Sequence, residues 1–103
     1  MGWTERPDLL RGAEAAYATY VWGEEMRPRY YPGNLLWVDP GQPLLPDKGV
    51  LVILHTGEAF PREFIRRDEE CLIVREYWPK PKEVPIPWGD IRSADRIIGV
   101  TDR

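Results

Sequence analysis

The chain has 103 residues, of which 43% are apolar and 30% charged, so it is long enough for one domain with a modest core. A net charge of −3 disfavours nucleic-acid binding by this chain alone, and no apolar run approaches the roughly 18 residues of a membrane helix. The single cysteine, Cys71, excludes an internal disulfide and a multi-cysteine metal site. We expect a cytoplasmic protein without cofactor or metal, in which Cys71 is a packing residue.

Eleven Pro and nine Gly predict frequent turns and short strands instead of long helices. Residues 1–14 are expected to be an N-terminal lead-in, and residues 15–103 to form the domain. Strands are predicted over Tyr17–Trp22 and Leu35–Val38, because both runs are rich in aromatic and apolar side chains. The segment between them contains Gly and Pro and is predicted to be a tight loop.

A hairpin is predicted in the middle of the chain. The apolar run Val50–His55 suits the centre of a sheet, and Thr56–Glu58 can turn the chain into Ala59–Arg67. Pro61 cannot donate to a ladder, so its strand should be at an edge or bulged at that point.

A second hairpin is predicted from Cys71–Tyr77, where apolar and charged residues begin to alternate. The prolines of Glu83–Pro87 restrict that segment to the edge of a sheet. Residues Gly89–Asp95 are expected to turn the chain, and Arg96–Thr101 to form the last strand. The predicted fold is therefore mainly β, built of short strands and β-hairpins.

Residues suited to nucleophilic catalysis are few, namely Ser93, Cys71 and His55, and a nucleophile also needs a base within hydrogen-bond reach. Ser93 lies in a turn-like context and His55 at the end of a strand, which favours structural roles for both. Glu24 and Glu25 are neighbours on a segment expected to be extended, so they should point to opposite sides and not share one site.

Several motifs occur in a characteristic order. They are Ala16–Val21, Gly23-x-x-Met26-x-Pro28, Tyr31–Pro40, a hairpin near Gly57-Glu58, and a closing Ile97–Val100. This order resembles the C-terminal domain of LexA-like and phage CI-like repressors, from about Ala15 to Val100. The resemblance implies a LexA/signal-peptidase-like fold and a relation to the LexA/UmuD-type serine peptidases.

In that family the loop reads Gly-Asp-Ser-Met-x-Pro, in which the Ser is the nucleophile, and a Lys on the hairpin strand is the general base. Carried over by position, the nucleophile falls on Glu25 and the base on Arg62. A carboxylate is a poor substitute for the Ser alkoxide, and a guanidinium stays protonated at neutral pH. The resemblance thus implies a pseudo-active-site loop made of Gly23, Glu24, Glu25, Met26 and Pro28. We expect Glu25 and Arg62 to form an ion pair across the old cleft.

The resemblance implies a catalytically inactive regulatory domain that mediates self-association, as a homodimer, of a phage-repressor-like transcriptional regulator. DNA would be bound by a separate helix-turn-helix module that this chain does not contain. Two alternatives remain open. One is a self-cleaving or other peptidase with its nucleophile relocated to Ser93 or Cys71. The other is a free-standing domain that binds a partner or small ligand in the old substrate cleft.

Overall fold

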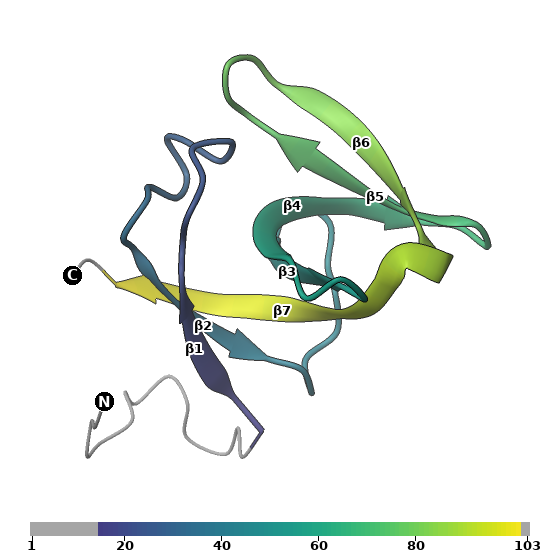
Figure 1. The fold of residues 1–103 in the computed structure, drawn as a ribbon, viewed down its shortest axis with the longest axis horizontal. Coiled ribbons are helices and arrows are strands. Elements are labelled where there is room, and N and C mark those ends of the chain that lie inside the picture. Colours follow the sequence, from purple (N-terminus) through teal and green to yellow (C-terminus); the bar gives the residue numbers. More distant parts are fainter. Residues whose placement is uncertain (1–14, 102–103) are drawn as a thin grey trace.

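Seven antiparallel strands form one sheet in the computed structural model, which describes residues 15–101 (Figure 1). The order of the strands is β1-β2-β7-β3-β4-β5-β6. Their bounds are β1 Tyr17–Tyr20, β2 Leu35–Asp39, β3 Gly49–Leu54, β4 Ala59–Arg67, β5 Cys71–Glu76, β6 Lys82–Pro87 and β7 Ile91–Thr101. A 3₁₀ turn, η2 (Trp88–Asp90), precedes β7. The predicted mainly β fold is confirmed.

Most strands agree with the sequence predictions. β2, β3, β4 and β5 lie within one residue of their expected bounds, whereas β1 ends two residues early, at Tyr20. The hairpins β3–β4 and β4–β5 are both present, and the proline-rich β6 is an edge strand. The expectation that the strand of Pro61 lies at an edge or is bulged there is wrong, because β4 lies between β3 and β5 and its register shift falls between Phe64 and Arg66. Pro61 opposes Leu51 on β3 and is tolerated because β5 pairs with β4 only from Glu63 onward. The lead-in predicted over residues 1–14 lies outside the described residues.

The turn predicted over Gly89–Asp95 is wrong, because β7 already begins at Ile91. The first half of β7 pairs with β3 and the second half with β2, so this strand joins the two parts of the sheet (Figure 1). Its polar residues are accommodated in the strand, since Asp95 accepts hydrogen bonds from Ser93 and from Tyr17 on β1. Pairing with two neighbours therefore overrides the turn signal of the polar side chains.

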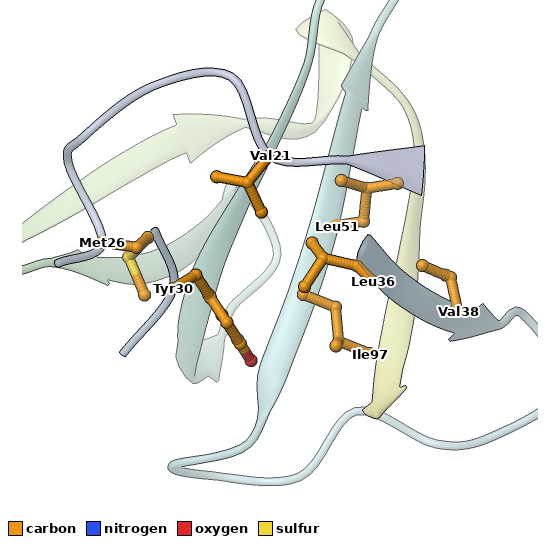
Figure 2. Close-up of a cluster of buried hydrophobic side chains, with 7 residues drawn as sticks. All are labelled: Val21, Met26, Tyr30, Leu36, Val38, Leu51 and Ile97. Atoms are coloured by element: carbon orange, nitrogen blue, oxygen red, sulfur yellow. The ribbon is translucent and has the colours of Figure 1, made fainter. Parts of the chain in front are cut away.

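Two clusters of buried apolar side chains stabilise the sheet. The first core cluster lies beneath the loop between β1 and β2 and contains Val21, Met26, Tyr30, Leu36, Val38, Leu51 and Ile97 (Figure 2). The second contains Val50, Val52, Phe64, Leu72, Val74 and Ile91. Successive residues of β3 belong to different clusters, because side chains alternate between the two faces of a strand.

Gly49 at the start of β3 allows Tyr30 to approach the sheet. A Cβ at this position would overlap the Tyr30 hydroxyl and lie 3.0 Å from Cβ of Ile97, and both neighbours are buried. We expect Gly49→Ala to lower the free energy of unfolding by about 1–3 kcal/mol, measured by urea denaturation. Gly89→Ala is the matched control, because a Cβ there meets nothing within 4 Å, and its effect should stay within about 0.5 kcal/mol. Equal effects of the two substitutions would contradict this account of Gly49.

Tyr17 connects β1 to β7 through a hydrogen bond of 2.7 Å from its hydroxyl to Asp95. Burial and this carboxylate raise the pKa of Tyr17 above its ordinary value of 10.0, so folding favours the neutral phenol. Its contribution to stability is therefore present below pH 10.0 and is lost as the pH rises further. In Tyr17→Phe, the decline of the free energy of unfolding above that pH should be shallower than in the wild type. An unchanged decline would exclude this contribution.

Candidate functional site

The loop between β1 and β2, residues 21–34, is held in place at both ends and by its own side chains. The amide of Val21 donates to the carbonyl of Asn34, and the amide of Gly33 donates to the carbonyl of Val21, both at 2.9 Å. Between these ends the loop is a succession of turns, and the side chains of Met26 and Tyr30 point into the first core cluster (Figure 2). The loop is therefore a fixed part of the fold.

A second contact fixes the loop to the segment that follows β5. The carbonyl oxygen of Glu25 accepts two hydrogen bonds, from the amide of Tyr77 at 2.7 Å and from the amide of Trp78 at 2.9 Å. The guanidinium of Arg27 lies 4.4 Å from the centroid of the Trp78 ring. The main chain at Glu25 is thus held between the first core cluster and the β5–β6 connection.

The carboxylates of Glu24 and Glu25 have different surroundings. Glu24 forms an ion pair with Arg27, one turn further along the loop. The Glu25 carboxylate folds back over Gly23, where a Cβ would overlap it. Glycine at position 23 therefore leaves the space that the Glu25 side chain occupies.

Arg62 lies on β4, directly opposite Val50 of β3, and its side chain is only 10% exposed. Its guanidinium pairs with Glu76 of β5 at 3.3 Å and donates to the carbonyl of Pro61 at 2.7 Å. Burial lowers the pKa of Arg62 from its ordinary value, and the carboxylates of Glu76 and Glu25 oppose this. The expectation of an ion pair between Glu25 and Arg62 is therefore wrong. Arg62 reaches the neighbouring strand, and Glu25 acts on it only through its electric field.

Glu63 is a further buried carboxylate, 5% exposed, which the sequence analysis did not single out. It accepts hydrogen bonds from Arg29 of the loop at 2.8 Å, from Arg75 of β5 at 3.4 Å, and from the hydroxyl of Tyr77. Burial and the bond to Glu63 raise the pKa of Tyr77 above its ordinary value of 10.0, which further favours the protonated phenol that donates this bond. Glu63 thus connects the loop, β4 and β5 in one network. The sequence does contain an indication of this buried carboxylate, because Glu63 is an acidic residue within a predicted strand, next to Arg62.

The other candidate nucleophiles are dispersed over the sheet. Ser93 is on β7 and donates to Asp95 at 3.4 Å, Cys71 opens β5, and His55 follows β3. Within residues 15–101 no hydrogen bond joins any two of these three side chains. His55 therefore serves neither Ser93 nor Cys71 as a general base, and the Asp95 carboxylate beside Ser93 already accepts the shorter hydrogen bond of Tyr17.

Two further classes of site were sought in the described part of the chain. Residues 15–101 contain no group of three or more His, Cys, Asp or Glu side chains arranged to hold a metal ion. No helix in the same range is long and apolar enough to cross a membrane.

Comparison with known proteins places this loop and sheet in a family. The profile of the Peptidase S24-like family matches residues 3–85, which is well over half of the chain. The chain belongs to the Peptidase S24-like family. This confirms the resemblance to LexA-like and CI-like proteins. The S24-like chain is also similar to Repressor protein C of Rhizobium phage 16-3, with 29% identity over 90 residues. The match covers 80% of this chain and 34% of that repressor, so the chain spans about one third of the length of this relative.

Proposed function

We propose that this S24-like chain is a catalytically inactive regulatory domain that mediates the self-association of a phage-repressor-like transcriptional regulator in the cytoplasm. The family match and the similarity to a phage repressor support a role in regulation. In this proposal the chain forms a homodimer, and a separate helix-turn-helix module carries the DNA contacts, because two-fold operators are read by paired modules.

The main support for catalytic inactivity is the environment of Arg62. At the position proposed for the general base, a buried guanidinium is bound to Glu76 and to the carbonyl of Pro61. A guanidinium has no lone pair available to accept a proton at neutral pH. At the position proposed for the nucleophile, the side chain of Glu25 is a carboxylate, which is a poor substitute for a serine alkoxide. Both exchanges support the proposal that no Ser–Lys mechanism operates at these positions.

Exposed aromatic side chains in and beside the loop support self-association. We call them the aromatic surface, and they are Tyr20, Trp22, Tyr31 and Trp78. Trp22 is 82% exposed, and with Tyr20 and Pro32 it lines a hollow of about 380 Å³. Exposed apolar patches of this kind mark interfaces between proteins, and tryptophan and tyrosine are enriched there. We assign this surface to the contact with a second copy of the chain.

Activity-based labelling tests the inactivity. We expect neither a fluorophosphonate serine probe nor an iodoacetamide cysteine probe to label the folded chain faster than the urea-unfolded chain. Ser93→Ala and Cys71→Ala are the controls that identify any labelled residue. Labelling that requires the folded state and disappears in one of these variants would contradict the proposal. It would favour a peptidase with a relocated nucleophile.

A further inference from the structure

The second half of β7 has one open edge. β3 pairs with β7 from Ile91 to Arg96, and β2 pairs with it from Arg96 to Thr101. Among the described residues 15–101, residues 97–101 therefore have a neighbouring strand on the β2 side only. The backbone hydrogen bonds that the described residues make outside the strands do not involve this segment either. An open edge of this length can accept about five residues of an extended peptide.

A groove of about 370 Å³ lies beside this open edge. We call it the β7 groove, and residues 97–100 of β7 form one wall, while Tyr30, Lys48 and Gly49 contribute to the other. Val100 presents an exposed apolar side chain at the end of the groove. The groove thus combines unpaired main chain with both apolar and polar side chains, as a site for a peptide strand does.

The charged residues that line the β7 groove are all cationic, although the chain as a whole carries a net charge of −3. They are Arg29, Lys48 and Arg96. Arg29 is neutralised by Glu63, but the other two have no carboxylate partner within residues 15–101. Arg96 donates through Nη1 to the carbonyl of Pro43 at 3.3 Å, and its buried Nε has no hydrogen-bond partner in the described part of the chain. A buried donor without a partner and an unpaired amine favour an anionic ligand.

We propose that the β7 groove binds an extended acidic peptide segment of a partner protein. The peptide adds as a strand to the open edge of β7 and places carboxylates near Lys48 and Arg96. The open edge supplies main-chain hydrogen bonds, and the two cations select for acidic side chains. This surface is different from the aromatic surface, so the proposal does not depend on how the chain self-associates.

Titration of the folded chain with synthetic peptides tests the proposal. The probe is an end-blocked peptide of about six residues that alternates Glu and Val, followed through backbone amide resonances by NMR. We expect saturable shifts at residues 97–101, and much weaker binding of the matched Lys–Val peptide. Lys48→Glu should weaken binding of the acidic peptide about tenfold. The matched control Lys80→Glu, an exposed position outside the groove, should leave the affinity unchanged.

Methylation of alternate peptide nitrogens separates strand addition from simple charge attraction. A peptide methylated on the edge that faces β7 should lose binding, whereas methylation on the opposite edge should preserve it. Four results would overturn the proposal. They are equal binding of the acidic and basic peptides, displacement of the peptide by equimolar inorganic phosphate, preferential binding of a DNA duplex at the same residues, and concentration-dependent shifts of residues 97–101 without peptide. The last result would assign the edge to a second copy of the chain.

Discussion

Replacing Met26 by alanine is expected to lower the free energy of unfolding by about 2–5 kcal/mol. The Met26 side chain is 1% exposed and lies with Val21 and Tyr30 beneath the loop (Figure 2). Its truncation leaves a cavity between the loop and the sheet, because the main chain at Glu25 is fixed by the amides of Tyr77 and Trp78 and cannot follow. Urea denaturation monitored by tryptophan fluorescence measures the loss.

Leu45→Ala provides the control for Met26→Ala. Leu45 is an exposed apolar residue in the connection between β2 and β3, so its truncation should change stability by no more than about 0.5 kcal/mol. A loss below about 1 kcal/mol in Met26→Ala would mean that the loop collapses onto the cavity at little cost. The description of the loop as a fixed part of the fold would then fail.

Glu76→Gln is expected to destabilise the chain by about 3 kcal/mol. The substitution removes the carboxylate that pairs with Arg62 while the guanidinium, 10% exposed, remains buried. The field of Glu25 offsets part of this loss, but no direct contact replaces the ion pair. Glu83→Gln is the matched control on the neighbouring strand β6. Glu83 is 46% exposed and pairs with Arg66 and Arg75, so its loss should cost less than about 1 kcal/mol.

A double variant separates the cost of an unpaired charge from the value of the ion pair itself. Arg62→Met in the Glu76→Gln background removes the buried charge and retains an apolar side chain of similar length. We expect it to recover most of the stability lost in Glu76→Gln, because a buried pair is often replaceable by apolar residues. If the effects of the two substitutions simply add, the two side chains are not coupled and the interpretation of Arg62 is wrong.

The strands that could be predicted from the sequence are those whose side chains alone define them. The apolar run at β3 and the prolines of β6 indicated a central and an edge strand, and both are found. The first half of β7 was missed because Ser93 and Asp95 are polar residues common in turns. Its strand conformation depends on pairing with β3 and on a hydrogen bond from Tyr17, which is 78 positions away in sequence.

Prediction of the candidate site from the sequence is limited in the same way, by contacts between strands. The sequence placed Glu25 in the loop and Arg62 on a hairpin strand, and the structure has both there. The partner of Arg62 could not be predicted, because it follows from the register of β4 against β5, in which Glu63 opposes Arg75. That register brings Arg62 to Glu76 and Glu63 to Arg75. Side-chain partners across strands depend on register, which one sequence does not define.

Sedimentation velocity over about a hundredfold range of protein concentration tests the central claim most directly. We expect the weight-average mass to rise from that of one chain toward that of two. Trp22→Ser should shift this transition to higher concentration, whereas Leu45→Ser, a loss of exposed apolar surface elsewhere, should not. A chain that sediments as a monomer throughout this range would contradict the proposed self-associating domain.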